Sequence, residues 1–258
     1  MVSRMMPPLA IVLAGRSNTA KRSDILTRVA RKFGERGQPV FVFESPRHAA
    51  SEGINRRLVQ ALPSIARSTG QALSWPRLAA WYAVKTALAC ASPHRLDFLM
   101  AALLPPWLIA SWELQRFIES LPHARVVVVT HSAGGVAATR IAAHPHVQAI
   151  ASFGYPFRHP ERRREAYRTR HLRAVAKPMV VIQGRGDAYG GDPAQFGRFL
   201  GPTCAIVSLE CDHEYHGLDD GAFARAWEAI DHVHDLACQK ESQAPRLDCA
   251  TSVSGQTC

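Results

Sequence analysis

The stretch that decides the fold is "RVVVVTHSAGGVAATR", residues Arg125–Arg140. Four valines followed by a threonine are typical of a strand that is buried on both faces of a sheet. The Ala-rich segment behind them suits a helix, because alanine has the highest helix propensity. Ser132 falls on the turn between this strand and this helix. Its position leaves two interpretations open, a nucleophile or a helix N-cap.

Short apolar runs alternate with amphipathic segments along most of the chain. In addition to Arg125–Thr130, we expect strands at Leu9–Ala14, Val40–Glu44, Ala149–Phe153, Met179–Gln183 and Ala205–Leu209. We expect helices at Lys21–Arg36, Ala133–Ala143 and about Leu218–Cys238. Apolar strands that alternate with helices predict an α/β fold with a doubly wound, mostly parallel sheet. In such sheets, ligands bind beyond the carboxyl ends of the strands.

Two regions depart from this alternation. Residues 45–122 predict a helical insertion before the serine-bearing strand, either part of the core or a cap over the ligand crevice. Its apolar stretch, Leu96–Trp112, is marginal in length for a membrane span and contains a proline pair, so we expect two packed helices and no integral membrane segment. Residues 239–258 are polar and without periodicity, which predicts a disordered tail. The expected organisation is therefore one domain over residues 1–238.

Composition restricts the class of protein. The chain has 258 residues, of which 47% are hydrophobic, and this is enough for one sizeable core. The formal net charge of +10 suits nucleic acid, a membrane surface or an anionic ligand. No paired-Cys/His finger, aromatic RNA-binding motif or basic zipper is present, so no nucleic-acid partner is expected.

Cysteine usage and the start of the sequence indicate a compartment. The six cysteines show no C-x-x-C spacing, so we expect neither a zinc site nor a thioredoxin-like motif. The short apolar run near the start reads as a first strand rather than a secretory signal. The expectation is a cytoplasmic protein with reduced thiols.

Two further residues make Ser132 a candidate nucleophile. A serine hydroxyl needs a base to take its proton, and the base needs an acid to orient it. Asp187 lies in a Gly-rich turn after the fifth expected strand, and His213 follows the sixth. Asp192 and His216 are rivals, but Asp192 directly precedes a proline, as helix caps do, and His216 lies further from its strand. We therefore predict Ser132 as nucleophile, His213 as base and Asp187 as orienting acid.

The small residues around Ser132 resemble the nucleophile elbow of the α/β-hydrolases, G-x-S-x-G. Gly134 matches the second glycine of that pattern, whereas Thr130 stands where the first glycine is usual. The stretch "FGYPFRHPERRREAYRTRHLRAVAKPMVVIQGRGDAYGG", Phe153–Gly191, further resembles a small group that includes the TEX-type and KANSL3-type hydrolase-like proteins. The resemblance implies an α/β-hydrolase fold. It also implies catalytic roles for Ser132, Asp187 and His213, which match the elbow, the acid position and the histidine position.

The expected reaction is hydrolysis of an ester or related acyl bond in a small molecule. Two backbone N–H groups should stabilise the oxyanion, one from Ala133 and one from Arg16 or Ser17 in the loop after the first strand. No metal or organic cofactor is expected. Seven arginines after the fourth strand suggest a short helix with a basic face that is either solvated or clamps an anion: Arg158, Arg162, Arg163, Arg164, Arg168, Arg170 and Arg173.

Two other functions stay open at this stage. The fold also hosts proteins without catalytic activity, so a hydrolase-like binding protein is one alternative. The other is a lipase that acts at a lipid interface, with the Trp-rich insertion as its lid. Peripheral membrane contact, the substrate and the oligomeric state are left open by the sequence.

Overall fold

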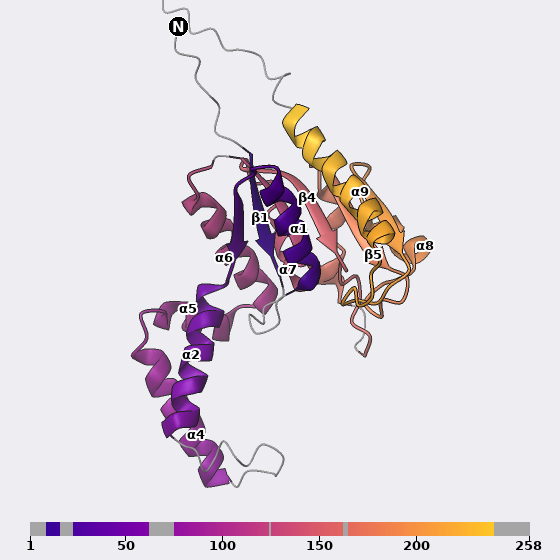
Figure 1. Cartoon of the computed structure of the whole chain (residues 1–258). Coiled ribbons are helices and arrows are strands. Elements are labelled where there is room, and N and C mark those ends of the chain that lie inside the picture. Colours follow the sequence, from indigo (N-terminus) through magenta and orange to yellow (C-terminus); the bar gives the residue numbers. More distant parts are fainter. Residues whose placement is uncertain (1–8, 16–22, 62–74, 124, 162–164, 240–258) are drawn as a thin grey trace, which may run out of the picture.

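The computed structural model describes residues 9–15, 23–61, 75–123, 125–161 and 165–239. Six strands form one parallel sheet in the order β2-β1-β3-β4-β5-β6 (Figure 1). The strands are β1 (Ala10–Ala14), β2 (Val40–Phe43), β3 (Val126–His131), β4 (Val147–Phe153), β5 (Met179–Gly184) and β6 (Cys204–Leu209). Each predicted strand is present, and the predicted doubly wound α/β architecture is confirmed.

The strand order creates a switch point in the middle of the sheet. After β1 the chain adds β2 on one side of it, and then crosses to β3 on its other side before adding β4, β5 and β6. Because all pairs are parallel, every strand ends at the same edge. The crevice at a switch point is the usual ligand site of such sheets, and β3 leads directly into it.

Helices cover both faces of the sheet. Helices α1 (Asp24–Glu35) and α9 (Asp220–Gln239) lie on one face, and α6 (Pro106–Ser120) and α7 (Ala133–Arg140) lie on the other (Figure 1). Alternate residues of β1 enter different cores, since Ile11 packs with the α1–α9 side and Val12 packs with the α6–α7 side. This two-sided burial explains why the strands read as continuous apolar runs.

Helix α1 shows how local sequence sets an element boundary. The Ser23 side chain accepts a hydrogen bond from the Leu26 backbone N–H at 3.4 Å and so caps the first turn. Ile25, Leu26, Val29 and Phe33 are buried on one side of the helix. Their spacing of three and four residues places them on one face, which packs on the sheet.

The predicted helical insertion contains four described helices. These are α2 (Pro46–Ala61), α4 (Trp75–Cys90), α5 (Arg95–Leu103) and α6. The proline pair Pro105-Pro106 separates α5 from α6, as expected from its effect on a helix. Helices α2, α4 and α5 extend beyond the carboxyl edge of the sheet as an arm (Figure 1). None of the helices in the described part of the chain has the length and hydrophobicity that a bilayer crossing requires.

The structure corrects the expectation for the arginine-rich segment. Its described residues form only two short 3-10 turns, η1 (Ala166–Arg168) and η2 (Leu172–Ala174), rather than a helix with a basic face. Arg158 donates to the Ala188 carbonyl and Arg173 to the Arg198 carbonyl, so these guanidinium groups hold loops in place. Arg162, Arg163 and Arg164 lie outside the described residues.

The remaining short elements are α8 (Pro193–Phe196) and the 3-10 turn η3 (Gly197–Phe199), both before β6. The expected tail lies outside the described residues, apart from Gln239 at the end of α9. The part of the chain that positions a site is thus the sheet with its carboxyl-edge loops.

Gly134 is predicted to be important for the stability of the fold. A Cβ at this position would lie 2.1 Å from the Ala14 carbonyl oxygen, a backbone atom that cannot move aside cheaply. We expect Gly134→Ala to lower the free energy of unfolding by about 2 kcal/mol or more. Thermal melting would then shift by roughly 2–4 °C per kcal/mol in a chain of this size.

The matched control is Gly53→Ala in α2, where a Cβ would meet nothing within 4 Å. Alanine in a helix interior is favoured over glycine by about 1 kcal/mol. The control should therefore be neutral or stabilising. A Gly134→Ala variant that melts as the wild type does would contradict the close approach of α7 to β1.

Candidate active site

Ser132 stands at the sharp turn between β3 and α7. Its backbone has φ of 57° and ψ of −125°, a strained conformation for a residue with a side chain. The backbone holds this turn through hydrogen bonds from Ser132 N to Phe153 O and from Gly135 N to Ser132 O, both 2.9 Å. The Ser132 hydroxyl makes no capping bond to the helix. The helix-cap interpretation of this serine is therefore wrong.

Small residues surround the turn because neighbouring segments of the chain approach it closely. Gly134 abuts the end of β1, and a Cβ at Gly135 would lie 2.5 Å from Ser152 Oγ. Thr130, at the position where the elbow pattern has glycine, is fully buried and its hydroxyl donates to the Ala151 carbonyl at 3.4 Å. The threonine is accommodated by the neighbouring strand β4, so the departure from the pattern leaves the turn intact.

His213 links the other two predicted site residues. Its Nδ1 lies 2.7 Å from Asp187 Oδ2, and its Nε2 lies 2.9 Å from Ser132 Oγ. In the tautomer protonated at Nδ1, the ring donates to the carboxylate and accepts the serine hydroxyl proton. All three side chains are buried, with residue exposures of 8% for Ser132, 3% for Asp187 and 8% for His213. The structure thus brings together three residues that lie on separate loops.

Asp187 is held by hydrogen-bond donors on both carboxylate oxygens. Gln183 Nε2 donates to Oδ2 at 2.6 Å, and the Tyr189 backbone N–H donates to Oδ1 at 2.7 Å. The carbonyl of Asp187 accepts the N–H groups of Gly190 and Gly191, which closes the turn after β5. Donors on each oxygen offset the cost of burying a carboxylate and fix the direction in which it faces His213.

Sequence reasoning did not assign several residues that position His213. The Tyr189 ring lies 4.5 Å from the His213 ring, centroid to centroid. His131 Nε2 contacts the His213 carbonyl at 2.9 Å. Gly154 has a φ of +55°, and a Cβ there would lie 3.1 Å from His213 Nδ1. The only available sequence signals for these roles were the glycine after β4 and the short spacing of Gln183 from Asp187.

The rival residues lie elsewhere. Asp192 caps α8 by accepting the Ala194 N–H, as its place before proline predicts. His216 is exposed and pairs with Asp212 at 2.8 Å, a hydrogen bond that raises the pKa of its imidazole. Burial, reinforced by the nearby Asp212 and Asp187 carboxylates, raises the pKa of the Cys211 thiol to about 11. This thiol is therefore protonated at neutral pH and does not compete as a nucleophile.

A partly buried polar network packs against α7. His171 Nε2 lies 2.8 Å from Thr139 Oγ1, and Tyr155 donates from its hydroxyl to the Arg168 carbonyl at 2.6 Å. Burial, together with the Arg140 guanidinium, lowers the pKa of His171 to about 4, so its imidazole is neutral near pH 7. Tyr155 and His171 belong to the stretch that carries the subgroup resemblance, and the contact of His171 with Thr139 links that stretch to α7.

Of the residues predicted to form the oxyanion hole, Ala133 lies in the described part of the chain. Ala133 is the first residue of α7, so its N–H lies at the positive end of the helix, next to Ser132. Arg16 and Ser17 lie outside the described residues. The chain reaches that loop through Gly15, whose carbonyl would lie 2.9 Å from a Cβ at Gly134. The loop after β1 therefore starts beside the elbow.

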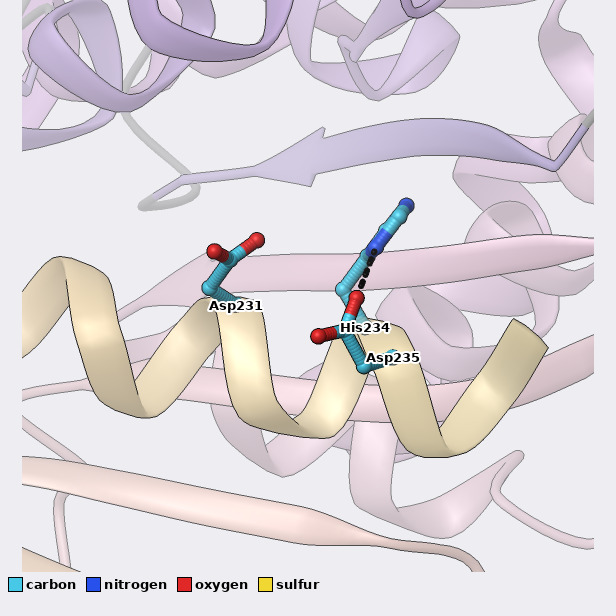
Figure 2. A group of neighbouring side chains, drawn as sticks. All are labelled: Asp231, His234 and Asp235. Carbon is cyan, nitrogen blue, oxygen red and sulfur yellow. Dashed lines mark ion pairs between the residues drawn. The ribbon is translucent and has the colours of Figure 1, made fainter. Parts of the chain in front are cut away.

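A separate cluster on α9 has the composition of a metal site. Single ligand atoms of Asp231, His234 and Asp235 lie within 4.8 Å of one another (Figure 2). However, Asp231 is already paired with the Arg36 guanidinium through both carboxylate oxygens. Asp235 is mostly exposed. We assign no metal to this cluster, because Arg36 already neutralises one of its two carboxylates.

Comparison with known proteins agrees with this fold. Residues 106–238 match the family described as an alpha/beta hydrolase domain. The chain therefore belongs to the α/β-hydrolase family. No curated protein sequence matches it.

Two solved structures illustrate the fold similarity. Est1E from Butyrivibrio proteoclasticus is 10% identical, with a TM-score of 0.51 over 90% of this chain and 89% of that one. An α/β serine hydrolase without a lid from Xanthomonas campestris is 15% identical, with a TM-score of 0.50 over 95% of this chain and 87% of that one. At these identities the similarity extends to the fold alone.

The strained backbone at Ser132 predicts how two substitutions there change the free energy of unfolding. Glycine adopts a positive φ without the steric cost that a Cβ imposes. We expect Ser132→Gly to be more stable than Ser132→Ala by about 1 kcal/mol in urea unfolding, since both lack the hydroxyl but only alanine keeps the Cβ. If the alanine variant is equally or more stable, the turn does not carry the strain that its backbone angles indicate.

Proposed function

We propose that this chain is a serine hydrolase that cleaves an ester or related acyl bond in a small molecule. The observation that carries the proposal is the pair of contacts made by His213, 2.9 Å to Ser132 Oγ and 2.7 Å to Asp187 Oδ2. These distances are within hydrogen-bond reach for both proton transfers that the reaction needs. Membership of the α/β-hydrolase family supports the same reaction class.

The proposed reaction begins with attack of Ser132 Oγ on the carbonyl carbon of the substrate. His213 Nε2 takes the hydroxyl proton as the new C–O bond forms, and Asp187 stabilises the imidazolium. The Ala133 N–H donates to the developing oxyanion, and a second donor is proposed from Arg16 or Ser17. Collapse of the tetrahedral intermediate breaks the bond to the leaving alcohol, which receives the proton from His213 and leaves an acyl-enzyme.

A water molecule completes the cycle in the proposed mechanism. His213 takes a proton from water as its oxygen attacks the acyl carbon, and then returns the proton to Ser132 Oγ as the acid departs. Protein side chains and backbone amides supply each proton transfer and each charge-stabilising contact. The proposed reaction therefore uses no metal or organic cofactor.

Two finer points belong to the same proposal. The subgroup with TEX-type and KANSL3-type proteins is proposed from the sequence resemblance of the stretch Phe153–Gly191. A cap function for residues 45–122 is supported by the start of α2, which follows β2 at the carboxyl edge of the sheet, where Ser132 also lies.

The first test is the loss of the nucleophile. We expect Ser132→Ala to lower kcat for p-nitrophenyl acetate by about 10³-fold or more and to abolish covalent labelling by a fluorophosphonate probe. The matched control is Ser120→Ala, at an exposed serine at the end of α6, which should retain both activities. Probe labelling that persists in Ser132→Ala would reject the assignment. A wild-type protein that reacts with neither reagent would favour the non-catalytic binding protein.

A second test concerns the orientation of Asp187. Replacing Gln183 by leucine removes the 2.6 Å donor to Asp187 Oδ2 but leaves the reacting groups in place. We expect kcat to fall about 10- to 100-fold with little change in KM, because the carboxylate that orients His213 is less well fixed. The control, Gln115→Leu on α6, removes an exposed bond to Glu119 and should leave kcat unchanged. Unchanged kcat in Gln183→Leu would show that this donor has no role in the reaction.

A further inference from the structure

Helices α4 and α5 are unusual because they are rich in apolar residues yet contain no buried side chain among those described. Large apolar groups are instead exposed along both helices: Trp75, Tyr82, Leu96, Leu99 and Leu103, with exposed fractions of 82%, 59%, 68%, 56% and 72%. Leu96, Leu99 and Leu103 are spaced three and four residues apart and so share one face of α5, and an exposed apolar face of this kind marks an interaction site. We call these two helices the apolar arm.

The apolar arm is separated from the hydrophobic cores of the sheet. Helix α4 packs on α2, and α5 contacts α4 and α6. Figure 1 places α4 farthest from the sheet, beyond its carboxyl edge. None of the residues of α4 or α5 belongs to either hydrophobic cluster of the described chain. The exposed surface of the arm is therefore available to an external partner.

The residue types on the insertion match those of proteins that lie at a membrane surface. Four of the five tryptophans in the sequence lie within residues 75–112. Trp75 and Trp112 are exposed, with the exposed Tyr82 on the same insertion. Tryptophan and tyrosine favour the boundary between lipid headgroups and acyl chains, because their rings are apolar and carry a polar group.

Charge identifies the kind of surface. Helices α4 and α5 carry the basic residues Arg77, Lys85 and Arg95, and their one acidic residue, Asp97, already pairs with His94 at 3.1 Å. The whole chain has a net charge of +10. Basic residues beside exposed apolar ones are attracted to anionic lipids. Docking of a second copy through the same face would instead bring these like charges together.

We propose that the apolar arm binds peripherally to an anionic lipid bilayer through its exposed apolar and basic side chains. Trp75, Leu99 and Leu103 enter the headgroup boundary, and Arg77 and Arg95 contact anionic headgroups. The arm extends beyond the carboxyl edge of the sheet, which is also the edge at which Ser132 lies (Figure 1). This binding goes beyond the proposed hydrolase function and does not depend on it.

The test is flotation of the full chain with vesicles of phosphatidylcholine alone or with 30% phosphatidylglycerol. We expect binding to the anionic vesicles. The partition coefficient for the zwitterionic vesicles should be lower by about tenfold or more. The apolar variant is Leu96→Ser/Leu103→Ser, and the charge variant is Arg77→Glu/Arg95→Glu. Each should lower the partition coefficient about tenfold or more, while circular dichroism and melting stay as in the wild type.

Matched controls separate the arm from general effects. Val42→Ser replaces an exposed apolar residue outside the arm, and Arg31→Glu/Arg225→Glu makes the same change in net charge on α1 and α9. Both controls should bind as the wild type does. Equal loss of binding in the charge control, or equal binding to both vesicle types, would overturn the proposal.

A second copy of the chain is the competing occupant. Light scattering would then show a concentration-dependent dimer that Leu96→Ser/Leu103→Ser converts to monomer. This result would overturn the membrane proposal and assign the apolar arm to a second copy of the chain. Hydrolysis of p-nitrophenyl acetate without vesicles is measured on the same variants. Because binding and hydrolysis are read separately, failure of the membrane proposal is distinguishable from failure of the proposed function.

Discussion

The structure depends on the close backbone approach of α7 to β1 behind Ser132. At Gly134 the backbones of α7 and β1 come so near that a methyl group would overlap the Ala14 carbonyl. This approach forces the chain to turn sharply as it leaves β3, and the turn lifts the Ser132 hydroxyl out of the helix-capping position. Packing energy from two buried cores therefore stabilises a local conformation that an isolated peptide would avoid.

The same constraint explains why the polar groups of the site converge. With Ser132 fixed at the end of β3, the loops after β5 and β6 reach it along one sheet edge, and Gly154 leaves room for the His213 ring between them. Asp187 is then buried with donors on both oxygens, so its orientation is set before any substrate arrives. Preorganised donors of this kind avoid the reorganisation that solvent would need.

The sequence predicts the sheet well because the physical signal is local. A strand covered on both faces must be apolar throughout, and the runs at Leu9–Ala14 and Val126–Val129 have no other good location in a protein of this length. The serine turn is also local, since the requirement for small residues lies within five positions of Ser132. The expectation that Asp187 and His213 lie near Ser132 followed from the topology, because parallel strands end at a common edge.

The remaining features are determined by contacts that are distant in sequence. Tyr189 contacts the His213 ring only because the loops after β5 and β6 are neighbours, and the sequence carries no signal for this pairing. The arginine-rich segment has helical spacing, but Arg158 donates to the Ala188 carbonyl, which is distant in sequence, and the described residues of the segment form only short turns. Weak local propensity is readily overridden in this way.

The chain divides its tasks between two regions. The family match covers residues 106–238, which contain Ser132, Asp187 and His213 together with strands β3 to β6 and helices α6 to α8. The preceding insertion, α2 to α5, contributes little to either core and instead adds exposed apolar and basic surface. This insertion leaves the sheet at the carboxyl edge, and its helices α4 and α5 belong to neither hydrophobic cluster that packs around the serine turn. The chemistry and the surroundings of the site can therefore vary independently in this fold.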